Sequence, residues 1–269
     1  ARVVALDNSE AMLELARQAQ RLVAKGRAQQ AGAAAGAVAF VEDQIDHRQH
    51  RLQALQPRLP LLSEEDADIP AAVRRQWTHY WLVDPLDGTR EFIKRNGEFT
   101  VNIALIAHGR PVLGVVHVPA LAQTYAAAQG LGAWRQQGED RQPLHTRRWP
   151  SRPVLFVSRS HHGRRADAAL SRFPPHEQVS KGSSLKFCLI AEGSADGYPR
   201  LGPTSEWDTA AAQCVVEQAG GAVLALPTLT PLQYNQGDGL INPDFVVVGD
   251  RQAPWRQWLQ QAGAAERRA

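Results

Sequence analysis

The chain has 269 residues, of which 43% are hydrophobic and 21% are charged, a composition typical of a globular protein with one large domain or two closely packed ones. No apolar run approaches the roughly 18 residues of a transmembrane helix, and residues 1–30 lack the basic-then-apolar layout of a signal peptide. The formal net charge is only +3 and the basic residues are dispersed, which disfavours a polymeric nucleic acid as a partner.

Two amphipathic helices are predicted in the N-terminal part, over residues 9–27 and from Gln44 to Leu55, because apolar residues recur there at helical spacing. Farther along, short apolar runs end in polar or glycine-containing turns, a pattern typical of strands. The predicted strands are, in chain order, Thr100 to Ile106, Pro111 to Pro119, Tyr125 to Ala128, Ala133 to Arg135, Val154 to Val157, Ala222 to Leu226 and Phe245 to Val248.

One helix in the second half has clear ends in the sequence. Its apolar residues include Ala211 and Cys214, Asp208 lies where an N-cap is expected, and Gly220 follows the last turn. Cys188 and Cys214 both fall in apolar, helix-like stretches and are predicted to be reduced core residues. A reducing cytoplasm is the compartment that such cysteines favour.

The polar, Arg- and Pro-rich stretch from Gln136 to Arg152 is the best candidate for a domain boundary. It divides the chain into an α+β part, residues 1–150, and an α/β part, residues 151–269, in which strands and helices alternate. A helix containing tryptophan is predicted after the last strand.

Three acidic clusters stand at the ends of predicted elements and contain Glu64, the pair Asp84 and Asp87, and Asp208. Hard divalent cations such as Mg²⁺ take carboxylate and carbonyl oxygens and accept substrate phosphate oxygens as further ligands. Asp84 and Asp87, with the Leu86 carbonyl between them, therefore predict a metal site. An Asx-rich surface turn is the alternative interpretation of the same residues.

The motifs S-E-E, D-P-L-D-G-T and W-D-T-A-A followed by A-G-G resemble, in order and spacing, the signature of the Mg²⁺-dependent, lithium-sensitive inositol monophosphatase superfamily. Within it the chain most resembles the bacterial 3′(2′),5′-bisphosphate nucleotidases, through residues 91–104, 158–161, 182–187 and 198–200. The resemblance runs from about Leu59 to Val248. It implies a layered α-β-α-β-α sandwich of the inositol monophosphatase and sugar phosphatase type, with the site between its two parts.

The resemblance also implies the chemistry, which is removal of the 3′-phosphate from adenosine 3′,5′-bisphosphate or its sulfated analogue with two or three Mg²⁺ ions. One ion would be held by Glu64, Asp84 and the Leu86 carbonyl, and a second by Asp84, Asp87 and Asp208. Thr89 would orient the attacking water. The residues implied at the substrate are Glu64, Leu86, Asp87, Gly88, Thr89, Ser183, Ser184, Lys186, Arg200 and Asp208.

The first part of the chain departs from the family pattern. Family members carry a lysine-containing loop and a D-x-S-P-V-T-x-A-D string there, whereas residues 31–44 read A-G-A-A-A-G-A-V-A-F-V-E-D-Q. Asp43 is the nearest candidate for the carboxylate that acts with Thr89, and Asp46 is the second choice. An ordinary solvated helix acid is the alternative interpretation of Asp43.

Several alternatives stay open at this stage. The protein would otherwise be an inositol or sugar phosphate monoesterase of the same superfamily, or a metal- and nucleotide-binding protein with impaired catalysis. A single-phosphate substrate has less use for the added cation of Lys186, which favours the nucleotide; a solvated Lys186 is the other interpretation. Glu91, Lys94 and Arg95 are expected to form a charged face near the entrance, and a surface salt-bridge role is the alternative interpretation. The resemblance allows peripheral attachment to the cytoplasmic face of the inner membrane.

Overall fold

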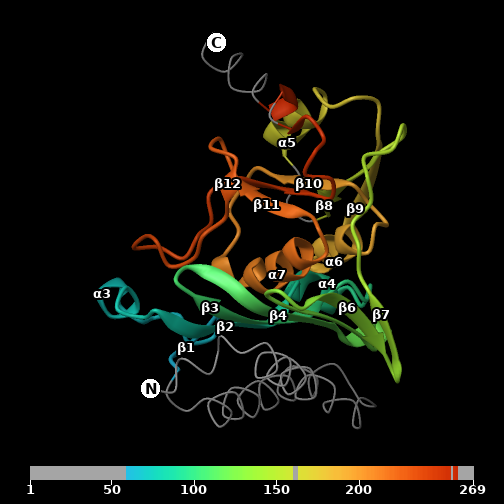
Figure 1. Cartoon of the computed structure of the whole chain (residues 1–269). Coiled ribbons are helices and arrows are strands. Elements are labelled where there is room, and N and C mark those ends of the chain that lie inside the picture. The colour runs from blue at the N-terminus through green and yellow to red at the C-terminus, as the bar shows by residue number, and fades with distance from the viewer. Residues whose placement is uncertain (1–58, 160–162, 256, 260–269) are drawn as a thin grey trace.

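The computed structural model describes residues 59–159, 163–255 and 257–259. These residues form four layers, which are a first sheet, a helical layer, a second sheet and an outer helical layer (Figure 1). The predicted helices over residues 9–27 and 44–55, and with them the first layer of the expected five, lie outside the described residues, as do Asp43 and Asp46. Among the described residues, no helix combines the length and apolar character needed to cross a membrane.

The first sheet has seven strands in chain order, and neighbouring strands are antiparallel except for β1 and β2. Its strands are β1 (Leu61–Ser63), β2 (His79–Asp87), β3 (Thr100–Ala107), β4 (Arg110–Val118), β5 (Gln123–Ala128), β6 (Gly132–Gln137) and β7 (Asp140–Pro143). Short helical segments interrupt this order at α3 (Ala71–Arg74), α4 (Thr89–Ile93) and η3 (Pro119–Leu121). The turn between β3 and β4 uses His108 and Gly109 at positive φ, in agreement with the predicted strand–turn–strand.

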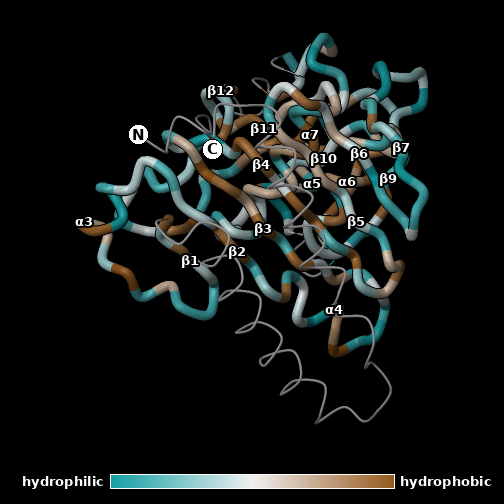
Figure 2. The backbone as a smooth tube through the Cα atoms, turned by 60° about the horizontal axis from the view of Figure 1, so that its bottom comes forward, coloured by the Kyte–Doolittle hydropathy of each residue, from teal (hydrophilic) through white to brown (hydrophobic). Residues whose placement is uncertain are grey.

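Both faces of the first sheet are buried, which explains why its central strands read as continuous apolar runs. On β3, Val101, Ile103 and Leu105 belong to one buried cluster, whereas Ala104 and Ile106 belong to the cluster between the sheets. The alternation follows from the two-residue period of a strand. Figure 2 shows the hydrophobic colour along much of β3 and β4.

The second sheet has six strands in the order β12-β11-β13-β10-β8-β9. Its strands are β8 (Val154–Ser158), β9 (Glu177–Lys181), β10 (Gly197–Arg200), β11 (Ala222–Ala225), β12 (Thr230–Pro231) and β13 (Phe245–Val248). β8 is parallel to β9 and β10, and the other pairs are antiparallel. Strand and helix alternate only as far as α7, since three strands then follow one another.

The helices of the second half are α5 (Arg164–Leu170), α6 (Leu185–Ala191), η4 (Glu206–Asp208) and α7 (Ala210–Gln218). α6 and α7 form the layer between the sheets, and α5 packs on the outer face of the second sheet together with Trp255. α7 contacts β4 closely, because a Cβ at Gly114 would clash with the carbonyl oxygen of Ala211 and lie 2.8 Å from the Cβ of Cys214. Glycine is therefore required at this crossing.

One strand was not predicted, and the start of one helix was placed wrongly. The polar stretch proposed as a boundary contains β7, whose side chains are all exposed at the edge of the first sheet, so this strand has no apolar alternation to reveal it. Asp208 is not the N-cap of α7; Thr209 holds that position and Asp208 ends η4. The cysteines agree with prediction, since Cys188 and Cys214 are free and buried. Division of the chain at residue 150 stays a prediction.

Candidate active site

β2 carries two acidic residues, Asp84 and Asp87, near its C-terminal end. The strand thus extends through residues that the sequence also allowed as a surface turn. The pairing of β2 with β3 shifts register between Asp84 and Asp87, so the strand continues through an irregularity of the β-bulge type. The Leu86 amide donates to Asp84 Oδ1 at 2.9 Å. A bulge re-aims side chains, which lets both acids serve one site.

The third acid comes from the other half of the chain. η4 begins with a capping box, in which Ser205 is the N-cap and its amide donates to Asp208 Oδ2 at 2.9 Å. This reciprocal capping explains why Asp208 ends η4 instead of starting α7. The box also fixes one carboxylate oxygen of Asp208 and so holds the side chain in place.

Asp84, Asp87 and Asp208 each offer a carboxylate oxygen, and these oxygens lie within 4.8 Å of one another. Asp84 is 1% exposed, and its Oδ2 has no hydrogen-bond partner among the described residues. A buried carboxylate oxygen without a donor is strongly unfavourable unless a cation satisfies it. Three convergent hard oxygens with one unsatisfied atom fit a divalent cation of the Mg²⁺ type.

The electrostatics of the cluster agree with that fit. Burial, followed by the charges of Asp87, Glu64 and Asp208, raises the pKa of Asp84 well above its usual range. Burial likewise raises the pKa of Asp87, and raises that of Asp208 to about 7. Burial, followed by the charges of Glu65 and Asp87, raises the pKa of Glu64 as well. The cluster therefore carries more negative charge than the fold alone neutralises.

Asp87 is held by Ser184 and by two residues, Thr100 and Asn102, that no local motif predicted. Its Oδ2 accepts from the Ser184 amide at 2.5 Å, from Thr100 Oγ1 at 3.2 Å and from Asn102 Nδ2 at 3.4 Å. The Ser184 hydroxyl in turn lies 2.7 Å from Thr100 Oγ1 and donates to Asn102 Oδ1 at 2.8 Å. The available signal was the pair of polar residues at alternate positions of an otherwise apolar strand.

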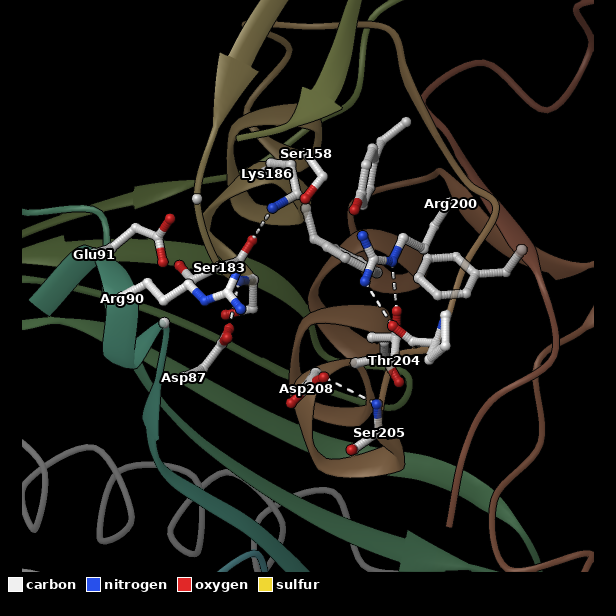
Figure 3. Close-up of a pocket in the computed structure, with 18 of the residues that line it drawn as sticks. Asp87, Arg90, Glu91, Ser158, Ser183, Lys186, Arg200, Thr204, Ser205 and Asp208 are labelled. Atoms are coloured by element: carbon white, nitrogen blue, oxygen red, sulfur yellow. Dashed lines mark hydrogen bonds between the residues drawn. The ribbon is translucent and has the colours of Figure 1, made fainter. Parts of the chain in front are cut away.

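A cavity of about 350 Å³ opens beside the acids. Of the residues expected at the substrate, eight line it, namely Asp87, Gly88, Thr89, Ser183, Ser184, Lys186, Arg200 and Asp208. Figure 3 shows Asp87 and Asp208 on one side of this space and Lys186 and Arg200 on the other. Glu64 and Leu86 are not in the lining; Glu64 acts on the acids through its charge, which raises the pKa of Asp84 and of Asp208.

Two buried cations face the cavity. Lys186 is 4% exposed, and its Nζ donates to Ser183 O at 2.6 Å and lies 5.0 Å from the centre of the Tyr198 ring. Burial lowers the pKa of Lys186 to about 8, although the charge of Asp87 opposes the shift. A solvated Lys186 is therefore excluded. Arg200 is 7% exposed and donates through Nε to Thr204 Oγ1 at 2.6 Å.

The expected charged face near the entrance is only partly present. Lys94 and Arg95 are exposed, but Glu91 is buried at 4% exposure and lines the cavity. Glu91 lies inside because α4 turns it toward the loop at Gly182. Arg90 also lines the cavity and was missed, since a lone arginine after the acidic motif carries no distinct pattern.

The chain resembles known proteins over most of its length. Residues 3–262 match the model of the inositol monophosphatase family. The Escherichia coli 3′(2′),5′-bisphosphate nucleotidase CysQ is 50% identical over 198 residues, which are 73% of this chain and 78% of that protein. The Haemophilus influenzae protein of the same name is 41% identical over 213 residues, which are 78% of this chain and 79% of that protein.

Solved structures give the same picture. The crystal structure of CysQ from Bacteroides thetaiotaomicron, described as a bacterial member of the inositol monophosphatase family, superposes with a TM-score of 0.74 at 34% identity and covers 91% of this chain and 98% of its own. Mycobacterium tuberculosis SuhB gives a TM-score of 0.69 at 26% identity, covering 96% of this chain and 97% of its own. The predicted layered sandwich is thereby confirmed as the fold class.

Proposed function

The chain belongs to the inositol monophosphatase family, and from that premise we propose that it is a 3′(2′),5′-bisphosphate nucleotidase, which removes the 3′-phosphate of adenosine 3′,5′-bisphosphate to give AMP and phosphate. The observation that carries the proposal is a cavity lined by Asp87 and Asp208 on one side, with Asp84 converging on them from behind, and by two buried cations on the other side. A substrate with two phosphates uses both sides. The relatives that are 50% identical are named 3′(2′),5′-bisphosphate nucleotidases.

Mg²⁺ is the proposed cofactor, with two or three ions per site. Glu64, Asp84 and the Leu86 carbonyl would hold one ion, and Asp84, Asp87 and Asp208 a second. Bound Mg²⁺ supplies positive charge for the phosphoryl oxygens and lowers the pKa of a water molecule. Support comes from the unpartnered Asp84 Oδ2 and the raised pKa values of the acids, which favour a cation at this position.

The chain's own groups then orient the reactants. Thr89 is exposed at the cavity, and its hydroxyl is proposed to hold the attacking water by a hydrogen bond. Its proposed partner, Asp43, lies outside the described residues. The amides of Gly88 and Thr89 would donate to the phosphate that is cleaved. Gly88 has φ 89°, which turns this backbone sharply after Asp87 and suits glycine.

The second phosphate is assigned to the cationic side of the cavity. Lys186 and Arg200 would contact it, and Ser183 lies beside them in the cavity wall. Ser184 was expected at the substrate as well, but its amide and hydroxyl are bonded to Asp87 and Asn102. Low exposure strengthens a charge-assisted hydrogen bond, because little water competes for the ligand. The sulfated analogue would offer similar oxygens and is a proposed second substrate.

We place the protein in the cytoplasm; peripheral membrane attachment has no support among the described residues.

A comparison of substrates tests the proposal. kcat/KM is measured in Mg²⁺ for adenosine 3′,5′-bisphosphate and for inositol 1-phosphate, with phosphate release as the readout. We expect a clear preference for the bisphosphate, and a preference for inositol 1-phosphate would instead identify a sugar phosphate monoesterase. Nucleotide binding by calorimetry with phosphate release at background would identify a binding protein that lacks catalysis.

A further inference from the structure

Glu98 lies where the two halves of the fold meet, directly behind the cavity wall, and neither the metal site nor the phosphate contacts use it. The residue is 9% exposed and precedes β3 by two residues. Oε2 accepts from the Gly182 amide at 2.7 Å and from Arg159 Nε at 2.9 Å. Oε1 accepts from Arg159 Nη2 at 2.9 Å and from Lys181 Nζ at 3.3 Å.

These donors all come from the second half of the chain, since Arg159 follows β8, Lys181 ends β9 and Gly182 follows β9. Burial alone would raise the pKa of Glu98, but the Arg159, Gly182 and Lys181 donors together hold it below its usual range. The carboxylate is therefore ionised and fully engaged. One acid of the first half thus anchors the loop that leads from β9 into α6.

Gly182 is the point where this anchor meets the cavity. A Cβ at residue 182 would lie 2.6 Å from Glu91 Cγ and 3.1 Å from the Glu98 carbonyl oxygen, so only glycine lets the backbone come so near. The Gly182 amide cannot turn while it donates a hydrogen bond to the Glu98 carboxylate. The loop is consequently held from two sides, by a charge and by close packing.

The carbonyls on either side of Gly182 orient Lys186. Lys186 Nζ donates to Ser183 O at 2.6 Å and to Lys181 O at 3.3 Å. Fixing the Gly182 amide therefore also fixes the two acceptors that aim the ammonium at the cavity. Figure 3 shows the contact between Lys186 and Ser183.

The metal side depends less on this loop. The Ser184 amide donates to Asp87, but Thr100 and Asn102 donate to the same oxygen from β3. Asp87 thus keeps two donors if the loop shifts, whereas Lys186 has no acceptor outside the loop among the hydrogen bonds of the described residues. A loop displacement should harm recognition of the substrate more than the chemistry at the acids.

We propose that Glu98 is a positioning residue that sets the preference for a doubly phosphorylated substrate, by holding residues 181–184 so that Lys186 points at the phosphate that is not cleaved. This rests on the proposed function, which assigns Lys186 to that phosphate. Glu98 acts through the loop and does not itself touch the substrate.

The test compares Glu98→Gln with Glu192→Gln. Glutamine at 98 keeps one acceptor for Gly182 but turns an NH₂ group toward the donors of Arg159 or Lys181. Glu192 is the matched control, because it accepts from Arg135 Nη1 and Tyr125 Oη, both at 3.2 Å, at the opposite end of α6. For Glu98→Gln we expect kcat/KM on adenosine 3′,5′-bisphosphate to fall about tenfold or more, mainly through KM.

Adenosine 3′-monophosphate, which lacks the second phosphate, should be affected much less by Glu98→Gln, and Glu192→Gln should change neither substrate's preference. Equal losses on both substrates would overturn the selectivity role. Amide hydrogen exchange of the peptide spanning residues 177–187 gives a readout that needs no activity, and it should quicken in Glu98→Gln but not in Glu192→Gln. Unchanged exchange would refute the positioning role. Failure of the proposed function would appear separately, as a wild-type protein that releases no phosphate.

Discussion

The unpartnered Oδ2 of Asp84 is the atom on which the site depends most. It is buried, and the charges of Asp87, Glu64 and Asp208 surround it. An asparagine side chain at residue 84 would bring neither the charge nor two equivalent oxygens to a cation. The residue should therefore be indispensable for activity and unfavourable for the metal-free fold.

Replacing Asp84 by Asn should lower kcat by orders of magnitude, because several kcal/mol of charge stabilisation depend on a bridging ligand. The metal-free variant should melt at a higher temperature than the wild type, since it removes repulsion among clustered acids. Phosphate release and thermal melting in EDTA measure the two effects. Asp140→Asn, on exposed β7, is the control and should change neither quantity. Retention of more than a tenth of wild-type kcat would contradict the bridging role.

Replacing Lys186 by Met should separate recognition from chemistry, because the bulk of the stem remains while the cation disappears. Loss of a charge-assisted contact of roughly 1.5–3 kcal/mol predicts about a ten- to hundredfold lower kcat/KM on adenosine 3′,5′-bisphosphate. Adenosine 3′-monophosphate is the internal control and should lose much less. If both substrates lose equally, Lys186 supports the fold or the metal site and does not read the second phosphate.

Among the individual site residues, the sequence predicted those whose neighbours along the chain form a motif. Asp84, Asp87 and Asp208 stand in short strings with turn residues, so their local context identified them. Thr100 and Glu98 were not predicted, because their partners are brought near only by the docking of the second half on the first. Hydrogen bonds between segments so far apart leave no local pattern.

Among the elements, the crossing of α7 over β4 has the least tolerance. Gly114 permits the backbone of α7 at Ala211 to lie against the strand, and Cys214 packs at the same point. A single methyl group there meets backbone atoms, which cannot rotate away as a side chain does. The helical layer also carries α6, so a shift of α7 is transmitted toward the cavity.

Replacing Gly114 by Ala should destabilise the protein by about 1–3 kcal/mol or more, as overpacking of a close-packed interior does. For a chain of this size that lowers Tm by roughly 2–4 °C for each kcal/mol. Thermal melting in the presence of Mg²⁺ is the measurement. Gly239→Ala is the matched control, because a Cβ there meets no atom within 4 Å. A Tm for Gly114→Ala equal to that of the control would show that the crossing can relax.

Strands with apolar runs were predicted well, and the polar strand β7 was not predicted. β3, β4, β11 and β13 agree with prediction to within about two residues at their ends, because burial on both faces gives them apolar runs. β7 has four exposed side chains, and its contacts with β6 are the backbone ladder and polar or cationic side chains, such as Gln142 with Arg135, which leave no apolar pattern. The start of α7 was misplaced because Asp208 is a typical N-cap residue, but the capping box with Ser205 makes it the end of η4, and Thr209 takes the N-cap of α7.

For the whole molecule, the acid cluster makes stability depend on pH in a direction opposite to most carboxylates. The pKa of Asp208 is raised to about 7 in the folded protein, from an ordinary value of 3.8. Without a cation the folded state holds more protons than the unfolded state between these values. The contribution to stability is therefore fully present below about pH 4 and is lost as pH rises through 7.

Melting of the metal-free protein should thus give a Tm several degrees higher at pH 5.5 than at pH 8, since a shift of one pKa unit is worth about 1.4 kcal/mol. Mg²⁺ should raise Tm more at pH 8, where the acids are ionised, and reverse the order. Glu98, whose pKa is lowered, titrates below this window and does not oppose the effect. Asp84→Asn should flatten the dependence. A metal-free Tm that rises from pH 5.5 to pH 8 would contradict the assignment.

The acids of the cluster come from the end of β2 and from η4, which belong to different halves of the chain. The cluster exists only while the halves are docked, so any cation bound there must leave before they separate. Magnesium supply would then govern how long each molecule survives in the cell as well as how fast it works. In magnesium-poor conditions proteases would meet the opened chain more often, and the amount of enzyme would fall together with its activity.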